Sequence, residues 1–197
     1  MNLVRIVDCL DEQLCQEIVD SSATLDFKRA TTFAQDGTNN ETAGRTNSQI
    51  PLPKEFEDRV HDCTNAALLA WSKQIAVEYP EVHQSMELPG VKPGLETTRE
   101  PFSLLRYQRL EEYQYHTDAS LFSRELGAHN LRDRLISVVI YVNDDFKGGE
   151  TQFHGRKYQP VRGKALVFPS NWNYPHRSCP VLDGEKIAIV TWYHPRF

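Results

Sequence analysis

Two residues separated by one position, His116 and Asp118, are the first feature of the sequence that could do chemistry. They lie in a segment with β-strand character, and side chains at positions i and i+2 of a strand point to the same side. An imidazole and a carboxylate would then face one space, as two ligands of a metal ion. The tripeptide alone is weak support, because a strand histidine is more often a surface or hydrogen-bonded residue.

A second histidine, His176, lies 60 residues further on, after an expected strand and before a turn. Two histidines and one carboxylate on one face of a metal leave positions open, as the oxygen chemistry of iron(II) requires. Two open positions could take a bidentate 2-oxo acid, and another could take O2. Lys186, ten residues after His176, would supply a cation for the distal carboxylate of that acid.

The second half of the chain carries the segments that would position these residues. They are rich in β-branched and aromatic residues, and turn residues separate them. The segments are 102–110, 134–143, 164–169 and 186–194. No helical pattern interrupts the last 60 residues. The pattern predicts an antiparallel sheet folded as a jelly roll or open barrel.

The first half predicts helices and loops. Asp11 can cap a helix that runs to about Ser22, and Pro53 introduces a second helix that Pro80 ends. Residues 34–49 are polar and predict a long loop. The apolar stripe of the second helix would pack on the sheet.

These elements predict an α+β protein with N-terminal helices packed on one face of the sheet core. We expect a single domain over residues 1–197. Its N-terminal part, residues 1–99, would be helical and loop-rich, and residues 100–197 would form the jelly-roll catalytic core that carries the metal site.

Composition restricts the class of protein. The chain is 40% hydrophobic and 25% charged, which is ordinary for a globular protein, and its net charge is −5 with scattered basic residues. That distribution disfavours nucleic acid as a partner. No run of 18 apolar residues and no signal peptide is visible, so we expect no membrane span and a cytoplasmic location. The four cysteines lack CxxC spacing, which disfavours a zinc knuckle or a disulfide framework.

The sequence resembles the prolyl 4-hydroxylase branch of the 2-oxoglutarate- and iron(II)-dependent dioxygenases, whose core is a double-stranded β-helix of the cupin-like kind. The resemblance covers about residues 100–194, with a looser match at 44–48, and it rests on an ordered set of segments. They are Arg106-Tyr107, Tyr113-x-x-His116-x-Asp118, Arg134 before LISVVIYVN, Gly148-Gly149-Glu150-Thr151-x-Phe153, Gly163-x-Ala165-Leu166-Val167-Phe168-Pro169, His176, Cys179-Pro180-Val181, Gly184-Glu185-Lys186 and Trp192.

Carried over residue by residue, the resemblance implies site roles for a small set of side chains. The implied ligands of Fe(II) are His116, Asp118 and His176. The implied 2-oxoglutarate pocket contains Lys186, which pairs with the C5 carboxylate, Tyr107, which donates a hydrogen bond to it, and Thr151. The candidates for substrate contact are Arg134 and Trp192. O2 would be the second cosubstrate, and ascorbate the reductant.

The predicted activity is hydroxylation of a C–H bond, with a prolyl residue in a peptide or protein as the implied substrate. Two alternatives stay open: a same-fold oxygenase of a free amino acid, small metabolite or nucleobase, and a cupin-like module that binds metal without turnover. A zinc hydrolase would need a general base near the metal, for which we find no good candidate. The segment Leu110-Glu111-Glu112 departs from the glycines common there in the family, and residues 119–133 are expected to form a lid. Sequence alone does not identify the substrate, the source or the oligomeric state.

Overall fold

A large antiparallel sheet forms the centre of the computed structural model, which describes residues 1–33, 39–85, 97–119 and 134–195. We call it the major sheet. Its strand order is β1-β13-β9-β16-β7-β5-β2, and β6 also pairs with β16. The strands are β1 (Arg5–Asp8), β13 (Lys164–Pro169), β9 (Ile136–Tyr141), β16 (Lys186–Pro195), β7 (Ser103–Tyr107), β5 (Ser48–Pro51), β2 (Lys28–Arg29) and β6 (Thr97–Arg99).

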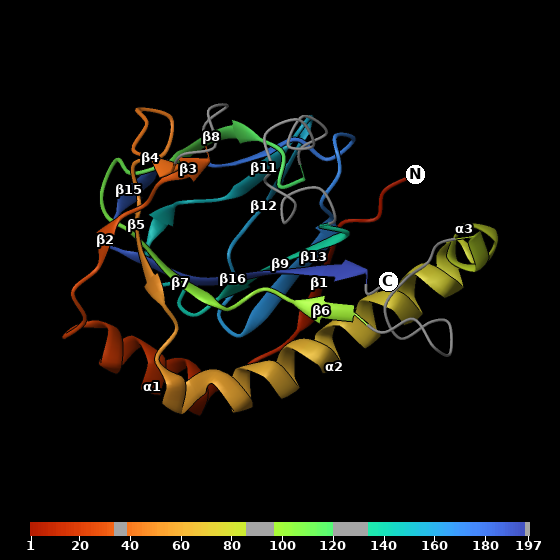
Figure 1. Cartoon of the computed structure of the whole chain (residues 1–197), viewed down its shortest axis with the longest axis horizontal. Coiled ribbons are helices and arrows are strands. Elements are labelled where there is room, and N and C mark those ends of the chain that lie inside the picture. Colours follow the sequence, from red (N-terminus) through yellow and green to blue (C-terminus); the bar gives the residue numbers. More distant parts are fainter. Residues whose placement is uncertain (34–38, 86–96, 120–133, 196–197) are drawn as a thin grey trace.

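A smaller antiparallel sheet, the minor sheet, lies across from the major sheet (Figure 1). Its strands carry His116 and His176. Its order is β12-β11-β14-β8. The strands are β12 (Arg156–Tyr158), β11 (Thr151–Phe153), β14 (His176–Ser178) and β8 (Tyr113–His116). Two short pairs join β10 (Lys147–Gly148) to β15 (Val181–Asp183) and β3 (Thr32–Phe33) to β4 (Asn39–Asn40). Two facing antiparallel sheets are the layers of a jelly roll.

The helices α1 (Glu12–Ser22) and α2 (Lys54–Glu78) cover the outer face of the major sheet, and α3 (Pro80–Ser85) follows directly (Figure 1). The predicted cap of α1 is present, because the Asp11 side chain accepts a hydrogen bond from the Leu14 backbone N–H. Within the described part of the chain, no helix is both long and apolar enough to cross a lipid bilayer.

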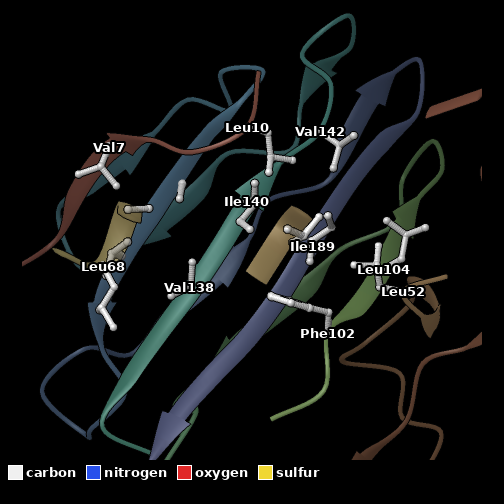
Figure 2. Packing of buried hydrophobic residues seen from close by; sticks show 14 of the residues in the cluster. Val7, Leu10, Leu52, Leu68, Phe102, Leu104, Val138, Ile140, Val142 and Ile189 are labelled. Carbon is white, nitrogen blue, oxygen red and sulfur yellow. The ribbon is translucent and has the colours of Figure 1, made fainter. Parts of the chain in front are cut away.

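Alternation along β16 divides the interior into two parts. Ile187 and Ile189 point to the helices and join the main hydrophobic cluster, in which Val138, Ile140 and Leu68 also pack (Figure 2). Val190 and Trp192 point the other way, towards the minor sheet, and belong to a second cluster. The strand therefore seals a helix-covered core on one side and lines the space between the sheets on the other.

The first half of the chain contributes strands where the sequence predicts helices and loops. β1 pairs with β13 and β5 pairs with β7, so both belong to the major sheet. The segment expected as one loop, 34–49, contains β4 and the start of β5, while residues 34–38 lie outside the described residues. Short strands of this kind are stabilised by distant partners, which local periodicity does not report. We propose from this shared sheet that residues 1–197 form one domain.

Candidate metal centre

Pairing between β8 and β14 brings the two histidines together. His116 lies directly opposite His176 in the antiparallel register, although 60 positions separate them in the sequence, and their ring centroids are 4.3 Å apart. His176 follows the strand β13, as expected, and is itself the first residue of the short strand β14. Both rings enter the space between the sheets from neighbouring strands.

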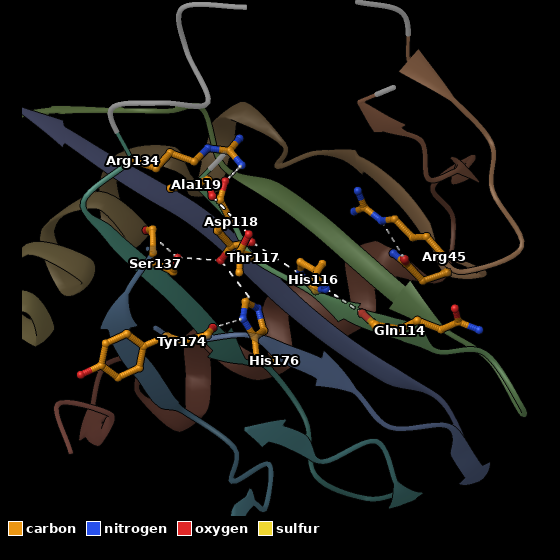
Figure 3. A network of polar contacts seen from close by, with 12 residues as sticks. Arg45, Gln114, His116, Thr117, Asp118, Ala119, Arg134, Ser137, Tyr174 and His176 are labelled. Carbon is orange, nitrogen blue, oxygen red and sulfur yellow. Dashed lines mark hydrogen bonds and ion pairs between the residues drawn. The ribbon is translucent and has the colours of Figure 1, made fainter. Parts of the chain in front are cut away.

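Asp118 lies beyond the end of β8, which finishes at His116. Its two carboxylate oxygens still face the histidines: Oδ1 is 3.5 Å from His116 Nε2, and Oδ2 is 3.6 Å from His176 Nε2 (Figure 3). Within the described residues, this is the one cluster of potential metal ligands, and one ligand atom from each residue lies within 4.8 Å of the others. The alternation argument correctly predicted that the side chains converge, but Asp118 is held by contacts other than strand pairing.

Backbone carbonyls fix the orientation of both imidazoles. His116 Nδ1 lies 2.8 Å from the carbonyl oxygen of Gln114, and His176 Nδ1 lies 3.1 Å from that of Tyr174 (Figure 3). A carbonyl oxygen can only accept, so each Nδ1 carries the proton and donates it. In the neutral tautomer, Nε2 then keeps its lone pair, and both Nε2 atoms face Asp118. This is the arrangement that ligating histidines adopt.

Burial and the contacts among its members together decide the charges of the cluster. Burial lowers the pKa of His176 to about 4, against the attraction of the Asp118 carboxylate, so this imidazole is neutral near pH 7. Burial alone would raise the pKa of Asp118, but His176, His116 and a hydroxyl donor together hold that pKa well below its usual range. The cluster near pH 7 therefore includes a neutral imidazole at His176 and an ionised carboxylate at Asp118.

Lys186 is a buried cation near the same strands. Its side chain is 2% exposed, and Nζ donates to the Gly149 carbonyl oxygen at 2.7 Å and to Ser178 Oγ at 2.9 Å. No carboxylate of the described residues forms an ion pair with it. Burial lowers the pKa of Lys186 to about 7. A buried ammonium group with only neutral acceptors is costly unless an anion joins it.

The other two residues expected in the cosubstrate pocket lie near Lys186 or its aromatic neighbours. The Tyr107 ring centroid is 4.8 Å from Lys186 Nζ, and burial raises the pKa of the Tyr107 hydroxyl to about 12. Thr151 Oγ1 is 2.8 Å from the hydroxyl of Tyr141, whose ring centroid is 5.6 Å from the same Nζ. Two neutral phenols and one ammonium group can face an anion without competing negative charge.

Arg134 and Trp192, the expected substrate contacts, lie against each other. The guanidinium carbon of Arg134 is 3.7 Å from the Trp192 ring centroid, and its Nε and Nη2 each lie 2.6 Å from a carboxylate oxygen of Glu100. His194 Nε2 is 2.7 Å from the same carboxylate. Arg134 is thus fixed rather than solvated, which sequence reasoning did not anticipate.

Several residues that support the site were not assigned roles from the sequence. They are Ser137, Ser170, Ser178 and Glu100, together with Tyr113, which the family motif includes. A polar residue inside the apolar run LISVVIYV was the available signal for Ser137. Residues 120–133, most of the expected lid, lie outside the described residues. In the unusual entrance segment, Leu110 is 62% exposed and has φ +68°, a conformation that favours glycine.

The donor set fits the metal and cosubstrate that the sequence implied. Two imidazole nitrogens and one carboxylate form the 2-His-1-carboxylate set typical of non-haem iron(II) oxygenases. The nearby buried lysine offers a site for the far carboxylate of a dicarboxylic 2-oxo acid. A chelating acid and O2 could therefore share the metal.

The sequence is similar to proteins of a known oxygenase family. The sequence model of a protein family, described as the 2OG-Fe(II) oxygenase superfamily, matches residues 102–194. Probable prolyl 4-hydroxylase 6 of Arabidopsis thaliana is 25% identical over 217 residues, covering 95% of this chain and 67% of the relative. The chain spans half or less of the length of the next curated relatives that it matches.

Solved structures agree on the fold. The viral collagen prolyl hydroxylase of Paramecium Bursaria Chlorella virus-1, solved with 2OG, has a TM-score of 0.65 at 18% identity, covering 100% of this chain and 97% of that one. A prolyl hydroxylase from Trichoplax adhaerens, solved with a hypoxia inducible factor peptide fragment, has a TM-score of 0.66 at 15% identity, covering 98% and 84%. At these identities the likeness shows the fold alone, and it confirms the predicted α+β double-stranded β-helix.

Proposed function

We propose that this chain is a working dioxygenase of the 2OG-Fe(II) oxygenase superfamily, in its prolyl 4-hydroxylase-like branch. It would hydroxylate a C–H bond of its substrate with Fe(II), 2-oxoglutarate and O2. Ascorbate is the proposed reductant that keeps the metal ferrous. The four thiols are free, which supports a reducing compartment, and the cytoplasm is the proposed location.

The observation that carries the proposal is the pairing of two features in one site. The three candidate ligands converge within 4.8 Å, and Lys186 supplies a buried ammonium group that lacks a carboxylate partner among the described residues. Ser178 connects them, because it contacts Lys186 Nζ and lies two positions after His176 on β14. A metal-binding module without turnover has no use for the buried cation.

Each residue has a proposed part in the reaction. His116, Asp118 and His176 would hold the metal. Lys186 and the hydroxyls of Tyr107 and Thr151 would bind and orient the cosubstrate, because all three side chains are buried close to the strands that carry the histidines. When bound, iron and 2-oxoglutarate supply the oxidation itself, with succinate and CO2 as coproducts. The protein orients the reactants and keeps water out.

A prolyl residue in a peptide or protein is the proposed substrate. The prolyl hydroxylase from Trichoplax adhaerens, which binds a peptide, supports this choice, as do the prolyl 4-hydroxylase relatives. Arg134 and Trp192 are proposed to contact the substrate. Fixing by Glu100 limits the movement of Arg134, so a substrate would meet a preorganised surface.

Turnover of 2-oxoglutarate to succinate tests the reaction class. Purified protein with Fe(II) and ascorbate should form succinate, and the His116→Ala and Asp118→Ala variants should lose this activity. His154→Ala is the matched control, because His154 is exposed and is not a member of the cluster of ligands. Full turnover in either ligand variant would refute the metal assignment. Metal binding without turnover in the wild type would favour the cupin-like module.

A second experiment tests the substrate. Proline-containing peptides are incubated with the active protein and screened by mass spectrometry for a gain of about 16 daltons, one oxygen atom. Hydroxylated proline would support the proposal. Turnover stimulated only by a free amino acid or small metabolite would replace it with the alternative oxygenase.

A further inference from the structure

Ser137 is a buried polar side chain near the start of β9, a strand of mostly apolar residues. It is 1% exposed, and its Oγ lies 2.6 Å from Asp118 Oδ2 and 2.8 Å from Ser170 Oγ (Figure 3). Ser170, the residue after β13, is also 1% exposed. Two buried hydroxyls therefore extend in a line from the major sheet to the carboxylate.

The direction of each hydrogen bond follows from the number of protons. Each serine hydroxyl has one hydrogen to donate. Ser137 Oγ donates this hydrogen to Asp118 Oδ2. Ser137 then has no hydrogen left for Ser170, so Ser170 must donate to Ser137. The pair has a single arrangement, and it directs a fixed donor at one oxygen of Asp118.

Asp118 depends on such contacts more than the two histidines do. His116 and His176 are held in paired strands of the minor sheet, whereas Asp118 lies beyond the end of β8. Around it, the Ala119 backbone N–H donates to the Ser170 carbonyl oxygen at 2.9 Å. Arg134 Nη1 lies 3.2 Å from the Asp118 carbonyl oxygen. The carboxylate is therefore positioned from the major sheet and the imidazoles from the minor sheet.

We propose that Ser137, supported by Ser170, is a positioning residue that fixes the Asp118 carboxylate against the two histidines and thereby sets the metal affinity of the site. The inference rests on the proposed metal site. Removing the donor from Oδ2 frees the carboxylate to rotate, so that ordering it becomes a cost of metal binding. Outer contacts of this kind change metal affinity by about 10- to 100-fold.

The test is titration of the metal-free protein with Co(II), followed by the visible absorption of the bound ion. No cosubstrate is present, so the readout is the dissociation constant and the spectrum, not activity. Ser137→Ala should raise the dissociation constant by about 10- to 100-fold and alter the Co(II) spectrum. Ser137→Thr keeps the hydroxyl and should restore affinity and spectrum. Ser170→Ala should have the smaller effect, because Ser137 keeps its bond to Asp118.

Ser72→Ala is the matched control for a lost buried hydroxyl. Ser72 lies on α2, is 3% exposed and contacts His83, away from the ligands. Its variant should bind Co(II) as the wild type does. A folded Ser137→Ala protein that binds Co(II) as tightly as the wild type would overturn the proposal. So would a Ser72→Ala protein whose affinity for Co(II) falls as much as that of Ser137→Ala.

The outcomes also separate this inference from the proposed function. A wild type that binds Co(II) and shows the Ser137 effect but never turns over 2-oxoglutarate refutes only the dioxygenase. A wild type that turns over normally while Ser137→Ala binds Co(II) unchanged refutes only the positioning role. A wild type that binds no Co(II) refutes both.

Discussion

The ring of Tyr113 stacks on the imidazole of His116, with centroids 3.6 Å apart and planes inclined by 13°. A β-bulge makes this possible. Tyr113 and His116 are three positions apart on β8, whereas their partners on β14, Ser178 and His176, are two apart. The extra residue turns both rings to the same side. The Arg45 guanidinium carbon also lies 4.8 Å from the Tyr113 ring centroid.

The stack should contribute to metal binding. Stacked aromatic rings are worth about 0.5–1.5 kcal/mol, so Tyr113→Ala should weaken Co(II) binding by roughly 2- to 10-fold through a less restrained His116. Tyr113→Phe keeps the ring and should bind Co(II) nearly as the wild type does. The measurement is Co(II) titration of the metal-free protein. Unchanged affinity in a folded Tyr113→Ala protein would show that the backbone bond to His116 Nδ1 suffices.

Binding of 2-oxoglutarate should weaken as the pH rises above 7. The pKa of Lys186 in the protein alone is lowered by burial to about 7, so above that pH the amine is neutral and must take up a proton to meet a carboxylate. The affinity should then fall by up to about tenfold per pH unit. Below pH 7 the lysine is already charged, and this dependence disappears.

Anaerobic titration of the Fe(II)-loaded protein between pH 6 and pH 9 measures this effect. Lys186→Met is the control, because its side chain is uncharged at every pH. The affinity of this variant for 2-oxoglutarate should be roughly 10- to 100-fold lower than that of the wild type, as expected for loss of a charge-assisted hydrogen bond. It should not change with protonation of a lysine as the pH rises. Metal affinity, measured in parallel, should be unchanged in the variant. A wild-type affinity that stays constant over this range would contradict the role of Lys186.

Gly149 and Gly155 offer a matched pair for testing the cosubstrate pocket. Both have positive φ, +68° and +74°. A Cβ on Gly149 would lie 2.8 Å from Phe146 Cε2 and 3.2 Å from Lys186 Cδ, whereas a Cβ on Gly155 would meet nothing within 4 Å. Alanine at either position should cost about 1–2 kcal/mol of backbone strain.

Gly149→Ala should cost about 1–3 kcal/mol more than Gly155→Ala because of the crowding. It should also raise the dissociation constant of 2-oxoglutarate, since it displaces Lys186, and Gly155→Ala should leave that constant unchanged. Urea unfolding gives the stabilities, and ligand titration gives the affinities. Equal losses in both variants would mean that Phe146 and Lys186 adjust without consequence.

Trp71 connects α2 to the N-terminal segment. Its side chain is fully buried, and its Nε1–H donates to the Leu3 carbonyl oxygen at 2.7 Å. Trp71→Ala should reduce the free energy of unfolding by about 3–5 kcal/mol, through the cavity and the unpaired carbonyl. Leu69→Ala, on the same helix at 46% exposure, should change it by less than about 0.5 kcal/mol. Chemical denaturation of both variants decides whether this contact anchors the segment.

The sequence by itself determined the residue types of the site and the local elements near them. The β-branched and aromatic residues of 134–143 and 186–194 identified the central strands β9 and β16, and Asp11 marked the start of α1. The spacing of His116 and Asp118 correctly predicted that they face one space. These features are readable because side-chain direction within an element repeats with a fixed period.

Only the tertiary structure decided how those residues meet. The register that places His176 opposite His116, the bulge that stacks Tyr113, and the reach of Ser137 to Asp118 all join segments that are distant in the sequence or belong to different sheets. Hydrogen-bond pairing between such segments leaves no local period to read. Desolvation likewise depends on the tertiary structure. Lys186 is an ordinary lysine in the sequence, and its pKa of about 7 arises only because the two sheets bury it without an anion.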